Sequence, residues 1–250
     1  MTSRLPFLQT SSLPSLSEQD AADTQSPARG KAMRANLLQK LRPPPLVHAW
    51  DFWHDRQDRK KSGAETDPDA SSYEDRLVKL ATVTDVREFW EVLNNFDVTA
   101  LPLRDSIHLF HKGIKPVWED PRNVRGGAWT FRVPKEKAAE FWKEICMMAI
   151  GEQLQEAVKS KRTTFIDDIC GISLSVRFTS MLVTIWNRDA EHKTGIDNIL
   201  QTVLERLPPD LVLKDSAYYY KRHSEHAGFK APGAEVVGGG AEGDEGGDAA

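Results

Sequence analysis

The chain has 250 residues, 40% of them hydrophobic, and a formal net charge of -4. This hydrophobic content is enough for the core of one large domain or of two small ones. The negative net charge excludes a protein that binds polyanions through bulk positive potential, so any contact with nucleic acid must be local.

In chain order, alternation of apolar and polar residues predicts strands over residues 46–55, 105–113, 127–133, 171–178, 181–187 and 210–215. Helical periodicity predicts a first helix after a cap at Thr84, a second from Pro134 to Gly151, and a third over residues 196–207, before a Pro-Pro pair. The elements do not alternate regularly, and several strands are close enough to form hairpins. We therefore expect an α+β fold, with an antiparallel sheet and helices on one of its faces.

Composition divides the chain into one domain and two tails. Residues 1–43 are rich in Ser, Gln, Pro and Ala without period, which predicts a disordered tail. Residues 228–250 are glycine-rich and acidic and predict a second disordered tail. Residues 44–227 remain as the folded domain, and the polar stretch 56–72 within it predicts a long loop.

The two cysteines, Cys146 and Cys170, form no CxxC pair and have no metal-ligand spacing to a histidine. This usage is typical of a reduced cytosolic or nuclear protein and predicts neither a disulfide nor a metal site. The chain has no run of about 18 apolar residues, and its N-terminal stretch lacks the apolar core of a signal peptide. The sequence therefore predicts a soluble protein that is not secreted and that has no cofactor.

One hairpin indicates which side chains lie on the open face of the sheet. Residues 171–178 and 181–187 are separated by Thr179-Ser180, so paired positions should have numbers that sum to about 359. One face then carries the core residues Ile172, Leu174, Val176, Phe178, Met181, Val183 and Ile185. The other carries Ser173, Ser175, Arg177, Leu182, Thr184 and Trp186. A tryptophan and an arginine on a polar face suit a flat, charged ligand, but the tryptophan would equally pack under a crossing loop.

The stretch HKGIKPVWEDPRNVRGGAW places Trp118 and Glu119 between a proline turn and a Gly-Gly pair. A carboxylate accepts two parallel hydrogen bonds, and the guanine edge offers two adjacent donors, N1-H and the N2 amino group. An indole beside it can stack on the base, and methylation at N7 would add cation-π attraction. The alternative is that Trp118 covers a sheet edge while Glu119 is solvated.

Several stretches, in this order, carry a resemblance to a known family: PPLVHAWDFW, TDVREFWEVLNNF, IHLFHKGIKPVWEDPRN with GGAW, FWKEICMMAIGEQ, DDICGISLSVRF and TIWNR. The chain resembles the translation initiation factor 4E family of mRNA cap-binding proteins. This resemblance implies a curved antiparallel sheet of about eight strands with three helices on its convex face. It also implies a concave mouth that holds 7-methylguanine between two aromatic side chains.

The resemblance assigns Trp118 to one stacking position, Glu119 to the guanine edge, Trp186 to the N7-methyl group and Arg177 to a phosphate. The second stacking position, usually tryptophan, falls on Tyr73. Tyrosine there resembles the divergent four-E homologous protein branch, which is linked to translational repression.

Three positions depart from the family pattern, because Ala128, Thr179 and Leu182 stand where many relatives have basic residues. Fewer cations imply weaker and less salt-dependent binding of the triphosphate bridge. The stretch 221–223, Lys-Arg-His, would restore some charge or would simply be a solvated charge run.

The family's partners lay a helix across the convex face, and the resemblance places that contact on Val86 and Trp90, with Met147 and Ile150 on the second helix. The implied partner is a helical motif of a scaffold initiation factor or of a translational repressor, bound to a monomer. The alternative is that the i, i+4 pair Val86 and Trp90 packs into the core.

Two rival functions remain. The first is an enzyme, for example a hydrolase acting on capped or free nucleotides, which would need clustered carboxylates holding a metal, a P-loop, or a nucleophile with its base. The sequence contains no GxxxxGK[ST], GxSxG or HExxH motif, and His108 and His111 fit ordinary surface or edge histidines. A cap-independent interaction scaffold is the second rival, favoured by Tyr73 and by the missing basic residues. With the resemblance, the sequence predicts a non-catalytic cytoplasmic protein that binds the mRNA cap and regulates translation initiation, as a repressor or as a specialised initiation factor.

Overall fold

The structure is a computed structural model that describes residues 30–31, 34, 42–57, 76–160 and 167–229. The chain divides into two units, Met1–Pro44 and Pro45–Ala250, and the fold described below is that of the second. Most of the predicted tails and of the predicted loop over residues 56–72 lies outside the described residues, so these assignments stay predictions.

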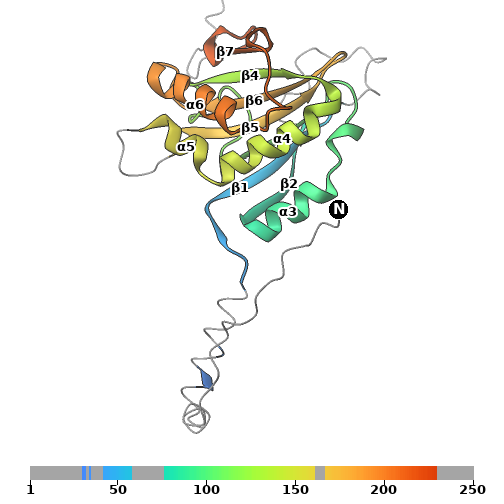
Figure 1. Ribbon diagram of the computed structural model, residues 1–250, viewed down its shortest axis with the longest axis vertical. Coiled ribbons are helices and arrows are strands. Elements are labelled where there is room, and N and C mark those ends of the chain that lie inside the picture. Colours follow the sequence, from blue (N-terminus) through green and yellow to red (C-terminus); the bar gives the residue numbers. More distant parts are fainter. Residues whose placement is uncertain (1–29, 32–33, 35–41, 58–75, 161–166, 230–250) are drawn as a thin grey trace, which may run out of the picture. The chain divides into compact units, whose positions relative to one another are not determined.

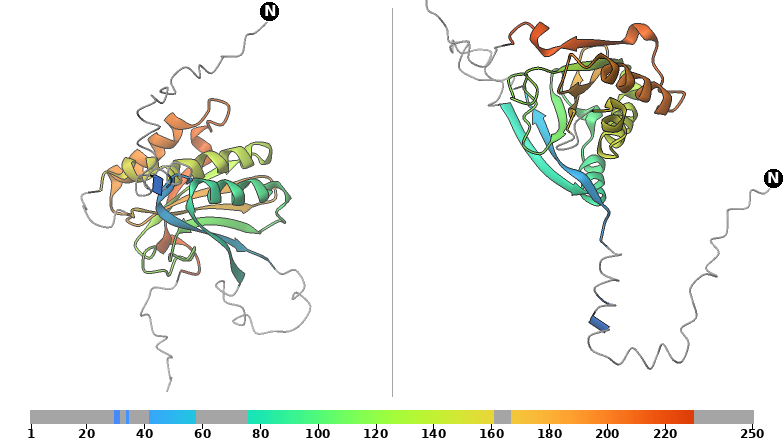
Figure 2. Two further views of the ribbon diagram at one scale, coloured as in Figure 1. Left: turned by 90° about the horizontal axis from the view of Figure 1, so that it is seen from below. Right: turned by 90° about the vertical axis from the view of Figure 1, so that its left-hand side faces the viewer.

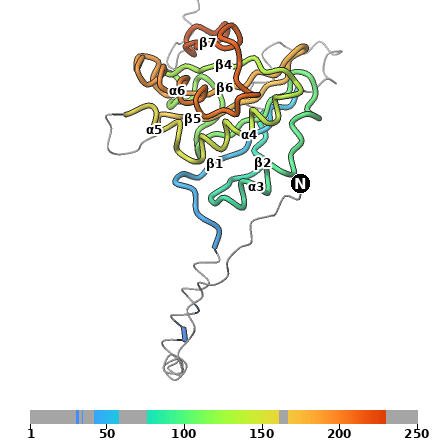
Figure 3. Tube along the Cα trace, viewed as in Figure 1, coloured from blue at the N-terminus to red at the C-terminus, as the bar shows by residue number. Residues whose placement is uncertain are grey.

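The described residues form one antiparallel sheet of seven strands, in the order β2-β1-β3-β5-β6-β4-β7 (Figure 1). The strands are β1 (Pro45–Asp55), β2 (Leu77–Asp85), β3 (Ser106–His111), β4 (Gly127–Val133), β5 (Ile169–Val176), β6 (Met181–Asn187) and β7 (Tyr218–Arg222). The sheet is curved and does not close on itself (Figure 2). The trace in Figure 3 shows the last strand, β7, returning beside β4.

The helices gather on one face of this sheet (Figure 2). They are α3 (Val86–Asn95), α4 (Lys135–Ile150), α5 (Gln153–Val158) and α6 (Lys193–Arg206), and the short 3-10 turns η3 (Val98–Ala100), η4 (Asp215–Ala217) and η5 (His223–Glu225) join the elements. The α+β architecture expected from the sequence is confirmed, with α5 as an additional short helix. None of the described helices has the length and apolar character needed to cross a membrane.

Helix α3 begins one residue later than predicted. Asp85, not Thr84, is the N-cap, because its side chain accepts a hydrogen bond from the Glu88 N–H at 2.8 Å. The Glu88 carboxylate in turn accepts from the Thr84 N–H at 2.7 Å. Helix α4 starts directly after Pro134 and ends where the Gly151 N–H donates to the Met147 carbonyl, as the sequence predicts.

The β5–β6 hairpin has the predicted faces but a different register. Ile172 pairs with Ile185 and Leu174 with Val183, which is a shift of two residues from the expectation. The shift arises because four residues, 177–180, form the connection instead of two. The prediction that Phe178 belongs to the core is wrong: it lies in this connection and is 82% exposed.

Sequence periodicity predicts one strand that does not form and misses the two edge strands of the sheet. The predicted strand over residues 210–215 is wrong, because this segment forms a turn that buries Leu211 after the Pro-Pro pair. Strands β2 and β7 were not predicted, and both are edge strands with mostly exposed or half-buried side chains. An edge strand buries little surface and therefore shows weak alternation.

The two faces of the sheet carry separate apolar clusters. The larger one lies between the sheet and the helices and includes Phe52, Phe89, Phe131, Phe141, Trp142, Ile172 and Val183. The smaller one lies on the opposite face and contains Phe110, Ile114, Ala128, Cys170 and Trp186, with Trp53 and Trp118 packed against it. Aromatic residues thus gather on the sheet face opposite the described helices.

Candidate functional site

A cavity of about 530 Å³ opens on the sheet face opposite the helices. A volume of this size lies within the range of small-molecule sites. Its walls come from the ends of β1 and β2, from β3, β5 and β6, from the turn before β3, and from residues 116–119. Four of the predicted binding residues line it together: Trp118, Glu119, Arg177 and Trp186. The fifth, Tyr73, lies outside the described residues.

One end of the cavity is aromatic. The Trp186 ring is nearly buried and meets the Phe110 ring edge-on, at 5.3 Å between centroids. The Phe110 ring lies over Gly171, where a Cβ would be only 2.3 Å from the phenyl ring, so this position requires a residue without a side chain. Trp118, half-buried on the loop that follows β3, packs against the same cluster.

Two histidines from the C-terminal segment brace these tryptophans. His226 stacks on Trp118 with ring centroids 4.5 Å apart and an angle of 16° between the planes. His223 is fully buried and packs against Trp186 at 4.5 Å. His226 does not line the cavity, whereas Trp118 does, which is consistent with a histidine behind the indole. Sequence reasoning did not find either contact.

The stretch 221–223 does not add charge to the cavity. None of its three residues is among the described lining residues. Arg222 instead forms an ion pair with Glu191, and burial lowers the pKa of His223 to about 3, so that this imidazole is neutral at physiological pH.

The loop that carries Trp118 and Glu119 is fixed at both ends by its own polar side chains. The Asp120 carboxylate accepts from the Lys115 N–H at 3.0 Å and from the Arg122 N–H at 2.9 Å. The Asn123 side-chain amide donates to the Val117 carbonyl at 2.7 Å. These bonds close the loop without secondary structure, as Asx-type contacts commonly do.

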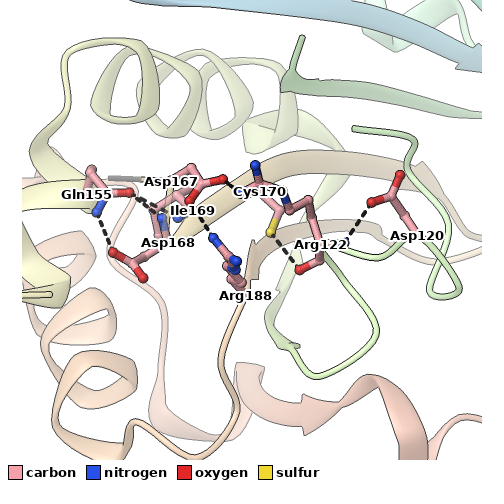
Figure 4. Close-up of polar contacts among 8 residues, drawn as sticks. All are labelled: Asp120, Arg122, Gln155, Asp167, Asp168, Ile169, Cys170 and Arg188. Atoms are coloured by element: carbon pink, nitrogen blue, oxygen red, sulfur yellow. Dashed lines mark hydrogen bonds and ion pairs between the residues drawn. The ribbon is translucent and has the colours of Figure 1, made fainter. Parts of the chain in front are cut away.

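A buried carboxylate ties this loop to the start of β5 (Figure 4). Asp167 is nearly buried and accepts from the guanidinium groups of Arg122 and Arg188, the second at 2.7 Å. Beside it, the Gln155 amide of α5 donates to Asp168 at 2.9 Å. The rigid loop therefore presents the Trp118 and Glu119 side chains in a defined position, which favours binding with a low ordering cost.

The floor of the cavity is polar. Ser106 and Ser175 are hydrogen-bonded at 2.8 Å, and His108 Nδ1 is hydrogen-bonded to Ser173 Oγ at 2.7 Å. His108 Nε2 has no partner among the described residues, although it is buried. A buried polar atom without a partner beside a cavity is a common feature of ligand sites.

The expectation that His108 and His111 are surface or edge histidines is wrong. They are 3% and 7% exposed, because β3 is a central strand between β1 and β5. Burial lowers the pKa of each to about 3. Both imidazoles are therefore uncharged at neutral pH.

The other end of the cavity is lined by three arginines, Arg76, Arg104 and Arg177. Arg76 forms an ion pair with Asp55 at 3.2 Å. Burial raises the pKa of the Asp55 carboxyl despite this pair. An aromatic end and a cationic end, joined by a polar floor, suit a nucleotide.

A larger cavity of about 900 Å³ lies near α5, the N-terminus of α6 and the ends of β4 and β6. It contains none of the predicted site residues. Within the described ranges, no group of three or more His, Cys, Asp or Glu side chains is arranged to hold a metal ion.

On the helical face, the four residues predicted to contact a partner are all half-buried: Val86 and Trp90 on α3, and Met147 and Ile150 on α4. Phe89 is the fully buried residue of α3 and anchors the helix to the sheet. Trp90, Met147 and Ile150 thus pack against the core with one side and remain partly exposed on the other.

The cavity lined by Trp118, Glu119, Arg177 and Trp186 has the features of a binding site for a flat ligand that carries hydrogen-bond donors and negative charge. The chain belongs to the family described as eukaryotic initiation factor 4E, whose family model matches residues 45–235.

Individual relatives agree with this assignment. The chain is 28% identical over 219 residues to the eukaryotic translation initiation factor NCBP of Oryza sativa, covering 83% of this chain and 87% of the relative. A solved complex of C. elegans eIF4E-3 with the 4E-binding protein Mextli and a cap analog matches with a TM-score of 0.61 and 29% identity, covering 73% of this chain and 94% of the other. Ascaris suum eIF4E-3 bound to the m2,2,7G cap matches with a TM-score of 0.60, 29% identity, and 76% and 96% coverage.

Proposed function

We propose that this protein binds the 7-methylguanosine 5' cap of mRNA. The observation that carries the proposal is that Trp118, Glu119, Trp186 and Arg177, from separate segments of the chain, line one cavity. Solved relatives with the same fold carry a cap analog or a methylated cap in their complexes. Membership of the family and the residues that line the cavity therefore both support cap binding.

In this proposal the base stacks on Trp118, and Glu119 accepts from the guanine N1-H and N2 amino groups. Trp186 lies beside the N7-methyl group, Arg177 contacts a phosphate, and Tyr73 supplies the second stacking ring. Stacking on an aromatic side chain stabilises a bound base by about 1 to 3 kcal/mol. Methylation places positive charge on the base, and cation-π attraction adds about 0.5 to 2 kcal/mol, which explains a preference for the methylated form.

We further propose that the protein acts in the cytoplasm, without catalysis, as a repressor or as a specialised factor in translation initiation. The half-exposed apolar residues Val86, Trp90, Met147 and Ile150 would receive a helical segment of a scaffold initiation factor or of a repressor on the convex face. The support is that a similar solved protein is in complex with a 4E-binding protein.

Two substitutions test the cap site. Trp118→Ala removes the stacking surface and should weaken binding of 7-methyl-GTP by about tenfold or more. Glu119→Gln keeps the shape but removes the charge-assisted hydrogen bonds, and a comparable loss is expected. Binding is measured by titration calorimetry on the full chain, after circular dichroism has shown that each variant is folded.

Tyr219→Ala is the matched aromatic control, because Tyr219 is exposed on the edge strand β7 and does not line the cavity. It should bind as the parent does. If the Trp118 and Glu119 variants are folded and retain the parent's affinity, the site assignment is wrong.

A further inference from the structure

Arg104 is a cation of the cavity that the sequence did not point to. It lies in the turn between η3 and β3, is exposed, and lines the end of the cavity where Arg177 also lies. Its backbone φ is 76°, in the left-handed region that residues other than glycine rarely occupy. A strained backbone at a cavity wall is a reason to ask what the side chain does there.

The fold brings Arg104 beside Arg177. The Arg104 N–H donates to the Val176 carbonyl at 3.0 Å, and Arg177 Nη1 donates to the same carbonyl at 3.0 Å. The Val176 N–H also donates to the Asp105 carbonyl at 3.0 Å. The turn before β3 is thus fastened to the end of β5, so the positions of the two arginines are coupled.

The charge of Arg104 is available for a ligand. Within the described residues, no hydrogen bond or ion pair engages its side chain, whereas Arg76, the third arginine of the cavity, is paired with Asp55. An arginine presents a planar fork of donors that matches phosphate oxygens.

The distance along β5 between the aromatic end of the cavity and the two arginines leaves room for an extended nucleotide. Trp186 pairs with Gly171 on β5, and Val176 is five residues further along the strand, which corresponds to about 17 Å. The hydroxyl groups of Ser173 and Ser175 line the path between. A nucleotide whose base stacks at the aromatic end would therefore extend its phosphates toward the two arginines.

We propose that Arg104 is a second phosphate-binding residue, which acts with Arg177 on the polyphosphate bridge of the cap. It would restore a cation to a chain that has Ala128, Thr179 and Leu182 where many relatives have basic residues. This inference rests on the proposed cap binding and deepens it, because it sets how strongly the protein discriminates between ligands with different numbers of phosphates.

The left-handed backbone provides an informative variant. Glycine adopts φ of 76° without strain, so Arg104→Gly removes the guanidinium group while the turn keeps its conformation. Arg104→Lys retains the charge but not the planar fork. Arg87→Gln, at an exposed arginine of α3 outside the cavity, is the control for the loss of one positive charge.

Each protein is titrated with 7-methylguanosine, its 5'-monophosphate and its 5'-triphosphate at several salt concentrations. Arg104→Gly should bind the triphosphate about three- to tenfold more weakly than the parent, with a salt dependence reduced by about one phosphate contact. Its affinity for the nucleoside should equal that of the parent. Arg104→Lys should keep most of the salt dependence, and Arg87→Gln should behave as the parent.

If Arg104→Gly binds the triphosphate with the parent's affinity and salt dependence, the inference is wrong, while cap binding by the parent still stands. If the parent binds none of the three ligands, the proposed cap binding is itself refuted, and the role of Arg104 falls with it. The two failures are therefore distinguishable in one set of titrations.

Discussion

Three buried histidines should make this protein sensitive to mild acid. His108, His111 and His223 are 3%, 7% and 0% exposed, and burial lowers the pKa of each from 6.5 to about 3. In the unfolded chain each returns to its ordinary pKa. Between these two values the unfolded state binds more protons than the folded state, so stability falls as the pH falls below 6.5.

The size of the effect follows from the pKa shifts. One histidine contributes about 1.4 kcal/mol per pH unit within this window. At pH 5, about 1.5 units below the ordinary pKa, each histidine costs about 2 kcal/mol, and the three together cost about 6 kcal/mol. A domain is typically stable by about 5 to 15 kcal/mol, so much of the stability at neutral pH should be lost.

The assay is urea unfolding, followed by tryptophan emission, at intervals from pH 7.5 to pH 5. His223→Phe tests the cause, because both ring nitrogens of His223 are buried and have no partner among the described residues. This variant should lose about one third of the pH dependence. A free energy of unfolding that stays constant between pH 7 and pH 5, or a variant with the parent's pH dependence, would refute the reasoning.

Three further predictions concern the loop, the thiols and the helical face. Asp167→Asn weakens the ion pairs with Arg122 and Arg188 that hold the Trp118 loop. It should destabilise the protein by about 1 to 3 kcal/mol in urea unfolding and reduce cap binding in calorimetry. Unchanged values in both assays would show that these ion pairs do not hold the loop. Cys146 and Cys170 are fully buried, and burial raises the pKa of both thiols, so neither should react with a thiol reagent until urea unfolds the chain; rapid labelling of the native protein would contradict this. Trp90→Ala should abolish binding of a helical partner peptide in a pull-down while 7-methyl-GTP still binds; retained peptide binding would remove Trp90 from the partner surface.

The sequence predicted the faces of the sheet better than its register. In the β5–β6 hairpin the register differs from the expectation by two residues, yet Ser173 and Trp186 lie on the face assigned to them. An even shift preserves which side chains share a face, whereas a shift of one residue would have exchanged the faces. Phe178 was assigned to the wrong face because it lies beyond the end of β5, in the connection to β6.

The parts that sequence reasoning missed depend on long-range contacts. His226 meets Trp118, 108 positions earlier, and no periodic pattern reports such a contact. Arg104 lines the cavity because its turn is hydrogen-bonded to Val176 at the end of β5, and no local sequence pattern predicts this contact. His108 is buried because β3 is central in the sheet, which its alternating sequence does not reveal. Tyr73 as the second stacking ring stays a prediction.

The most direct test of cap binding is a titration of the full chain with 7-methyl-GTP and, separately, with GTP, followed by tryptophan emission. Stacking on Trp118 predicts saturable quenching by the methylated nucleotide and a much weaker response to GTP, because only the methylated base carries positive charge. No response to either nucleotide would contradict cap binding and would favour a scaffold that acts through its helical face.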